Sequence, residues 1–320
     1  MRKNKSIKAS FIFGAFFLTG LIIGILIGWK RGIPFLMKQG QYSIGIYSGT
    51  TPFSLTSNKN PVLTAKNIDD IDARFVADPF MINNNQSWFM FFEVYNERTQ
   101  QGDIGLAKSE DGYSWKYQKI VIDAPYHLSY PFVFKDKNTF YMIPETSSIY
   151  SVNLYKAIEF PQKWQFVKTI IKGNYRDSTI LFYDGYWWVF TSDRDDMLHI
   201  FYSKELLGKW YPHPQNPVVY RQKSKARSCG RIIMFKNKIY RFSQDCEKIY
   251  GHQVRSFEIT ELTQNSYREI EVRENPVLSP GKTGWNSGSM HHIDLHQLKS
   301  GSWIACVDGS TKKIKLGLKY

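Results

Sequence analysis

One hairpin pattern occurs five times along this chain, and it constrains the fold more than any other feature. Each copy has a polar start, an apolar strand, a polar turn, a second apolar strand and a polar end. The copies are ADPFMINNNQSWFMFFEV, SYPFVFKDKNTFYMIPET, RDSTILFYDGYWWVFTSD, SCGRIIMFKNKIYRFSQD and MHHIDLHQLKSGSWIACVD, which begin at Ala77, Ser129, Arg176, Ser228 and Met290. Equivalent second-strand residues of consecutive copies lie 52, 47, 52 and 64 positions apart. This near-regular spacing predicts a repeat architecture.

Further strand-like runs lie between the hairpins, such as DIGLAKSEDGYSW, SVNLYKA and LHIFYSK. Each repeat unit therefore predicts four strands, and the aromatic content of 16% favours strands over helices. Four-stranded units that repeat radially form a β-propeller, so five copies predict an all-β fold with five blades. The last blade is expected to take strands from residues 43–65, although the C-terminal KIKLGLK competes for the same place.

The polar ends of the repeats are expected to converge. In a propeller the first strand of each blade lines the axis and the second runs antiparallel beside it, so first-strand starts and second-strand ends share one face. The starts supply Asp78, His127, Tyr130, Asp177, Arg227, Arg231, His291 and His292. The ends supply Glu93, Glu145, Ser192, Asp193, Gln244, Asp245 and Asp308. The pattern predicts a ring of carboxylates, basic groups and imidazoles.

Such a ring suits general acid–base chemistry on a sugar, in which two carboxylates flank the bond. The predicted catalytic set is Asp78, Glu145 and Asp177, from three neighbouring blades. The predicted substrate-binding set is His127, Tyr130, Arg227, Arg231, Gln244, Asp245, His291 and His292. Tyr130 and Trp285 are also expected to stack on sugar rings. The alternative for each residue is structural, with strand-end polar groups that cap the backbone and one another.

Two features of the ring allow more than one interpretation. His291 and His292 are candidate ligands for a metal or a water, but a metal site needs several ligands in fixed geometry. Pairing within the ring is favoured, and no metal or cofactor is predicted. The stretch RQKSKARSCGR, from Arg221 to Arg231, is either an anion-binding lip or a solvated loop.

The N-terminal 38 residues have a different composition. Residues 11–29, FIFGAFFLTGLIIGILIGW, are uncharged over a length that spans a bilayer as one helix. KRGIPFLMK follows in place of a cleavage site, so an uncleaved signal anchor is predicted. The excess of basic residues before the span favours a cytoplasmic N-terminus and an exported propeller, whether periplasmic, extracellular or lumenal. The predicted domains are residues 1–38, with the tail and anchor, and residues 39–320.

The same region explains much of the charge. Residues 1–38 hold seven basic residues and no acid, which is half of the net charge of +14. This basicity is a membrane-flank signal, and no nucleic-acid-binding motif is found. Cys229 and Cys246 stand opposite each other in the fourth hairpin and would be able to form a disulfide in an exported domain. Cys306 is expected to be a buried thiol.

A family resemblance rests on the motifs VADPFM, WFMFFEV, GDIGLAKSEDGYSWKYQKIV, HLSYPFVF, YMIPET, FPQKW, ARSCGR, SQDCEKIYG and MHHID. Over about residues 43–310 the chain resembles the domain that precedes the glycosyltransferase in glucosamine inositolphosphorylceramide transferases, and its bacterial relatives. That domain is similar in turn to the five-bladed propellers of glycoside hydrolase family 43. The resemblance implies an Asp base, which Asp78 matches, a second Asp that tunes, and a Glu acid. The blade order of Glu145 and Asp177 departs from that pattern.

Two functions follow from these observations. The first is a membrane-anchored propeller that binds a carbohydrate or glycolipid and assists glycan or glycolipid synthesis beside a partner glycosyltransferase. The alternative is a glycoside hydrolase-like enzyme that uses the paired carboxylates.

Overall fold

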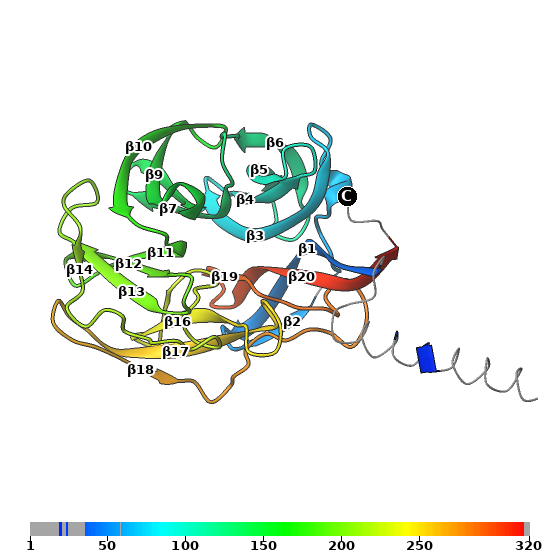
Figure 1. Ribbon diagram of the computed structural model, residues 1–320. Coiled ribbons are helices and arrows are strands. Elements are labelled where there is room, and N and C mark those ends of the chain that lie inside the picture. The colour runs from blue at the N-terminus through cyan, green and yellow to red at the C-terminus, as the bar shows by residue number, and fades with distance from the viewer. Residues whose placement is uncertain (1–18, 21–23, 25–35, 58, 317–320) are drawn as a thin grey trace, which may run out of the picture. The chain divides into compact units, whose positions relative to one another are not determined.

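The computed structural model describes residues 19, 20, 24, 36–57 and 59–316. By its contacts the chain divides into Gln41–Thr311 and a second unit of residues 1–40 with 312–320. In the described residues, twenty strands form five four-stranded antiparallel sheets around a common centre (Figure 1). The predicted five-bladed, all-β propeller is therefore confirmed.

The blades are numbered here from the first repeat. The first blade is β3 (Ala73–Asn84), β4 (Ser87–Asn96), β5 (Gln101–Ser109) and β6 (Lys116–Ile122), and the second is β7 (Ser129–Asp136), β8 (Thr139–Thr146), β9 (Ser151–Glu159) and β10 (Lys163–Lys172). The third is β11 (Arg176–Tyr183), β12 (Tyr186–Ser192), β13 (Leu198–Ser203) and β14 (Tyr211–Pro212). The fourth is β15 (Ile233–Phe235), β16 (Lys238–Asp245), β17 (Gln253–Leu262) and β18 (Tyr267–Glu271). Two short 3-10 helices, Ala65–Asn67 and Ser147–Ile149, lie between strands.

The fifth blade closes the ring with strands from both ends of the chain. Its order is β19 (Ile293–Gln297), β20 (Trp303–Leu316), β1 (Leu36–Thr51) and β2 (Ser54–Ser57). The prediction that residues 43–65 complete the last blade is confirmed. The described part of KIKLGLK continues β20 and does not replace the N-terminal strands.

Three Asn-Pro-Val segments dock against the third strands of blades. In each, the Asn side-chain amide accepts from the N–H and donates to the C=O of one strand residue, as a neighbouring strand would. The pairs are Asn60 with Ile46, Asn216 with Ile200 and Asn275 with Ser256, all at 2.7–2.8 Å. These amides satisfy backbone groups beyond the short fourth strands.

The hydrophobic core lies between neighbouring blades. One buried cluster joins the first three blades and includes Phe80, Phe132 and Val189. Three further clusters join the fifth blade to the first, the fourth to the fifth and the third to the fourth. Burial of one such Phe side chain contributes roughly 1.5–3 kcal/mol, so the ring is held together blade against blade.

A bulge at the start of the first strand recurs in three blades. Asp78, Tyr130 and Asp177 have φ of 51°, 46° and 51°. The strand register shifts across the same positions, between Ala77 and Phe80 in the first blade and at the equivalent places in the next two. Non-glycine residues adopt positive φ at a cost of about 1–3 kcal/mol. A bulge changes the direction in which its side chain points. It directs Asp78 and Asp177 to the centre and Tyr130 into the hydrophobic core.

The predictions of a membrane anchor and of the state of the cysteines have different outcomes. Among the residues that the structure describes, no helix has the length and apolarity needed to cross a membrane. Most of the predicted anchor, residues 11–29, lies outside the described residues. Cys229 and Cys246 are both free thiols, and Cys306 is free and buried as predicted.

Candidate functional site

Carboxyl groups from four of the five blades gather at one face of the ring centre. Asp78 comes from β3, Glu93 from β4, Glu145 from β8, Asp177 from β11 and Asp308 from β20. Four of them are 0–6% exposed, and Glu145 is partly exposed. They act on one another electrostatically, because Asp78, Asp177, Asp308 and Glu145 all contribute to raising the pKa of Glu93, although its burial is the larger cause. We call these five residues the carboxyl cluster.

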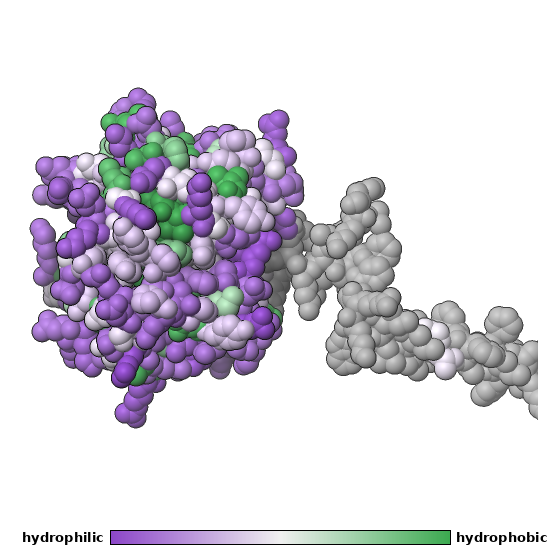
Figure 2. All heavy atoms as spheres, turned by 60° about the vertical axis from the view of Figure 1, so that its left-hand side comes forward, coloured by the Kyte–Doolittle hydropathy of each residue, from purple (hydrophilic) through white to green (hydrophobic). Residues whose placement is uncertain are grey.

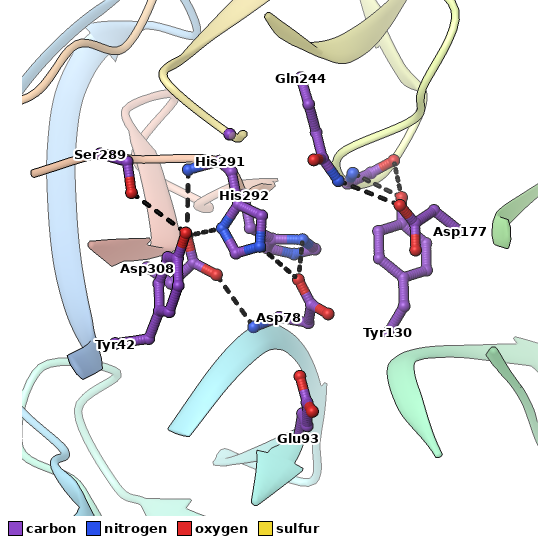
Figure 3. Close-up of polar contacts among 12 residues, drawn as sticks. Tyr42, Asp78, Glu93, Tyr130, Asp177, Gln244, Ser289, His291, His292 and Asp308 are labelled. Carbon is purple, nitrogen blue, oxygen red and sulfur yellow. Dashed lines mark hydrogen bonds and ion pairs between the residues drawn. The ribbon is translucent and has the colours of Figure 1, made fainter. Parts of the chain in front are cut away.

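Asp308 and His291 form a buried pair that faces Asp78 (Figure 3). Asp308 Oδ1 lies 2.7 Å from His291 Nδ1, and Asp308 Oδ2 accepts from the Asp78 N–H at 3.1 Å. His291 Nε2 lies 3.5 Å from Asp78 Oδ1. Burial opposes the imidazolium, but Asp308 keeps the pKa of His291 above its ordinary value. Burial raises the pKa of Asp78 to about 7, against the attraction of His291.

Asp177 is held by Arg227 and Gln244. The Arg227 Nε–H donates to Asp177 Oδ2, and Gln244 Nε2 donates to the same oxygen at 3.0 Å. Burial alone would raise the pKa of Asp177, but the Arg227 guanidinium keeps it below its ordinary value. Asp177 is therefore an ionised carboxylate at neutral pH.

Glu145 has the opposite protonation state. Burial and then the neighbouring Asp177 carboxylate raise the pKa of Glu145 to about 8. A hydrogen bond joins the two carboxyls, and Ser147 Oγ donates to Glu145 Oε1 at 2.7 Å. A protonated carboxyl beside an ionised one gives the site a proton donor near neutral pH.

His127 adds a neutral imidazole at the edge of the cluster. The Gly102 N–H donates to His127 Nδ1 at 2.9 Å, so the ring proton is on Nε2, which lies 3.7 Å from Glu93 Oε1. Burial lowers the pKa of His127. His127 is about one-third exposed and therefore reaches the open side of the site.

One group of the described residues has the ligand types and closeness of a metal site. Ligand atoms of Asp78, His291 and Asp308 all lie within 4.8 Å of one another. His291 Nδ1 is already bonded to Asp308, whereas Asp78 Oδ1 has no hydrogen bond. The predicted pairing of His291 within the ring is present, and the absence of a metal remains a prediction.

Comparisons with known proteins agree with this architecture. The family model described as "Glucosamine inositolphosphorylceramide transferase 1, N-terminal" matches residues 36–310. The chain belongs to this family. Glucosamine inositolphosphorylceramide transferase 1 of Oryza sativa subsp. japonica is 39% identical over 298 residues, and that of Arabidopsis thaliana 38% over 299 residues. Both matches cover 85% of this chain, but the chain spans only about 40% of the length of these relatives.

Solved structures share the fold at low identity. A protein from Parabacteroides distasonis described as a glycoside hydrolase has a TM-score of 0.60 at 11% identity, covering 84% of this chain and all of that one. The β-1,2-mannobiose phosphorylase of Listeria innocua has a TM-score of 0.59 at 12% identity, covering 83% of this chain and 96% of that one. The RS223 β-xylosidase has a TM-score of 0.55 at 16% identity, covering 68% and 80%. These likenesses concern the propeller fold alone.

Two residues predicted to bind substrate, Tyr130 and Arg231, point away from the carboxyl cluster. Tyr130 is 0% exposed, and its hydroxyl accepts from the Gly230 N–H at 2.6 Å, so its ring offers no open face to a sugar. Arg231 turns into the ring interior, where it pairs with Asp294 at 2.9 Å and donates to the Val133 C=O at 3.0 Å.

Three other predicted residues also differ from expectation. Asp245 accepts from Gln253 Nε2 at 2.9 Å and does not join the cluster contacts. His292 lies beside the cluster, with its Nδ1 3.8 Å from Asp78 Oδ1, but it is 0% exposed and burial lowers its pKa to about 4. Its ring lies edge-on to that of Phe80, 4.6 Å away. Trp285 packs against the backbone of Gly45 and Gly309, which have no Cβ in its way.

Two aromatic residues at the site, Tyr42 and Tyr250, were not predicted from the sequence. The Tyr42 ring lies 4.7 Å from the His291 ring, and its hydroxyl bonds Ser289 Oγ at 3.1 Å. Tyr250 is 51% exposed, lies 5.4 Å from the His291 ring, and has the Arg227 guanidinium 5.1 Å from its ring centre. Tyr42 precedes the first predicted closing strand by one residue. An aromatic residue soon after the end of the second strand was the available signal for Tyr250.

Proposed function

We propose that this chain binds a carbohydrate or glycolipid at the carboxyl cluster and assists glycolipid synthesis. The observation that carries the proposal is the cluster itself, in a member of a family named for a glycolipid transferase. Carboxylates accept hydrogen bonds from sugar hydroxyls, and Tyr250 offers an exposed ring for stacking. Arg227 and His127 supply donors at the same opening.

The role in synthesis is proposed to be assistance to a partner glycosyltransferase. The relatives are named glucosamine inositolphosphorylceramide transferase 1, and the family model that matches residues 36–310 describes their N-terminal part. The propeller would hold the glycolipid headgroup while the partner forms the bond. We further propose that residues 11–29 anchor the chain in a membrane, with the N-terminus cytoplasmic and the propeller exported.

The second candidate is a glycosidase-like activity. It is favoured by the opposite protonation of two adjacent carboxyls, a protonated Glu145 and an ionised Asp177. In that scheme Glu145 protonates the leaving oxygen, and Asp177 keeps the pKa of Glu145 high. Asp78 acts as the base on the opposite side of the sugar.

The test uses the full-length chain in a mild detergent. Binding is measured to liposomes that contain inositolphosphorylceramide bearing glucosamine, and to liposomes of ceramide without a headgroup. Asp78→Asn should weaken headgroup binding by about tenfold or more, because one charge-assisted hydrogen bond is worth roughly 1.5–3 kcal/mol. The matched control Asp184→Asn lies at an exposed turn of β11–β12 and should bind like the wild type.

Two outcomes would reject the proposal: no preference for the headgroup, or equal binding by Asp78→Asn and the wild type. Release of free sugar is followed in the same samples. Sugar release that disappears in Glu145→Gln would favour the glycosidase-like candidate, and binding without release would exclude it.

A further inference from the structure

Two loops with the same Ile-Tyr ending follow second strands at the face of the carboxyl cluster. SSIY, residues 147–150, comes after β8, and EKIY, residues 247–250, comes after β16. Ile149 is 42% exposed, Tyr150 65%, Ile249 47% and Tyr250 51%. Tyr220, which is 59% exposed, lies in the segment between β14 and β15. We call these five side chains the apolar rim.

Backbone hydrogen bonds hold each segment of the rim in place. The Cys246 N–H donates to the Lys223 C=O at 3.0 Å, which ties the EKIY loop to the segment of Tyr220. The Gly173 N–H donates to the Tyr150 C=O at 2.9 Å, which fixes the SSIY loop to the second blade. The rim is therefore built on three consecutive blades and has defined positions.

The rim borders the opening of the carboxyl cluster. The SSIY loop begins at Ser147, whose hydroxyl donates to Glu145 at 2.7 Å. Tyr250 is in contact with both Arg227 and His291, 5.1 and 5.4 Å from its ring centre. A molecule that reaches the carboxyl cluster thus passes apolar side chains that would otherwise be left in water.

A pocket of about 490 Å³ opens beside the SSIY loop. Its lining combines Ile149, Tyr150 and the half-exposed Phe166 with Lys172. Ser151, also in the lining, has a buried hydroxyl without a hydrogen-bond partner. This mixture of apolar surface, a cation and an unused hydroxyl matches the boundary between headgroup and acyl chain of a lipid. Figure 2 shows that one side of the propeller is mostly hydrophilic, with hydrophobic residues gathered in limited patches.

Basic residues accompany the rim. Lys172, Lys223 and Lys248 are exposed, with Glu247 as the neighbouring acid, and the Arg221 guanidinium lies 5.2 Å from the centre of the Tyr220 ring. Basic side chains near a bilayer surface gain about 1 kcal/mol each from anionic lipids. Tyr favours the interface itself. The charges therefore complement an anionic lipid surface.

We propose that the apolar rim rests on a lipid bilayer with anionic headgroups, so that the carboxyl cluster faces the membrane. The rim is made of separate loop tips, whereas a stable protein–protein contact needs a continuous surface of roughly 800 Å² on each partner. A bilayer accommodates separate tips because it has no fixed shape. This proposal rests on the proposed function only for the role of the contact, which would give the carboxyl cluster access to a glycolipid held in the membrane.

The experiment measures the local depth of single positions in the full-length chain. An environment-sensitive fluorophore is attached at Tyr150→Cys or Ile249→Cys in a Cys246→Ser background, because Cys229 and Cys306 are 0% exposed. The chain is reconstituted in bilayers of phosphatidylcholine and phosphatidylserine whose acyl chains carry a quencher near the headgroup. Matched control positions are Leu207→Cys and Met234→Cys, 49% and 48% exposed. Leu207 lies in the turn after β13, and Met234 lies just before the turn after β15, at the strand ends opposite the carboxyl cluster.

Rim labels should lose at least about twofold more emission than control labels, because interfacial side chains enter a bilayer by roughly 5–10 Å. Equal quenching at all four positions, or none at the two rim positions, would overturn the proposal and leave the rim as a surface for a protein. These bilayers contain no glycolipid. A failure here therefore leaves headgroup binding at the carboxyl cluster untouched, and a failure of headgroup binding leaves this result standing.

Discussion

Replacing Arg227 with Met should destabilise the protein in a pH-dependent way. Arg227 is the cation of the buried pair with Asp177, which is 1% exposed. Met keeps much of the aliphatic stem and removes the charge. Loss of one partner of a buried pair costs about 3–5 kcal/mol when the other stays charged. Asp177 can become neutral by taking up a proton, which lowers that cost.

The free energy of protonating Asp177 depends on pH. Protonating a carboxyl with a reference pKa of about 3.9 costs about 4 kcal/mol at pH 7 and about 1.5 kcal/mol at pH 5. The expected loss is therefore about 3–4 kcal/mol at pH 7 and about 1.5–2 kcal/mol at pH 5. In the wild type the lowered pKa of Asp177 means that its stabilising contribution is present at neutral pH and is lost only as the pH falls through that pKa. In the variant the pKa of Asp177 is raised, so stability falls as the pH rises from about 4 to 7.

Urea unfolding of the full-length chain, followed by tryptophan fluorescence at both pH values, measures the loss. The matched control is Arg268→Met, which breaks the exposed pair of Arg268 with Glu261 at 3.2 Å. That change should cost less than about 1 kcal/mol at either pH. The reasoning is refuted if Arg227→Met loses the same stability at pH 5 as at pH 7, or no more than the control.

Two other substitutions test the frame around the site. Tyr130→Phe removes the acceptor of the buried Gly230 N–H and should cost about 1–3 kcal/mol in urea unfolding. Its headgroup binding should stay within about twofold of the wild type, and a large binding loss with full stability would contradict the buried position. Asn216→Ala removes both hydrogen bonds to Ile200 and should cost about 1–3 kcal/mol by the same assay. The exposed Asn265→Ala serves as control, and an equal loss in both would count against strand-like docking by Asn216.

The blades could be predicted from the sequence because the pattern of each blade lies within one continuous stretch of residues. Alternating apolar residues, a polar turn and a fixed interval are sufficient to predict a propeller. Closure by β1 was predicted from the leftover strand signals before the first repeat. The candidate site was predicted in part, since strand ends such as Glu145 and Asp177 do meet at the centre.

The orientation of individual side chains was beyond such reasoning. Neighbouring residues of a strand point to opposite faces, so Gln244 bonds Asp177 while Asp245 turns toward Gln253. Which of the two faces inward depends on a register that the sequence does not reveal. Tyr130 is directed into the core by a bulge, and Tyr250 reaches the site through a loop conformation. The conformations of bulges and loops depend on tertiary contacts, and such contacts leave no periodic pattern in the sequence.

The fifth blade makes the site dependent on both ends of the chain. Tyr42 enters it on β1, whereas His291 and Asp308 come from the last repeat. During synthesis, Asp78 would stand without its paired carboxylate and imidazole until the fifth repeat had been made. Ligand binding at the carboxyl cluster would then stabilise only molecules in which the fifth blade has closed. Molecules with an open ring would gain no such stability.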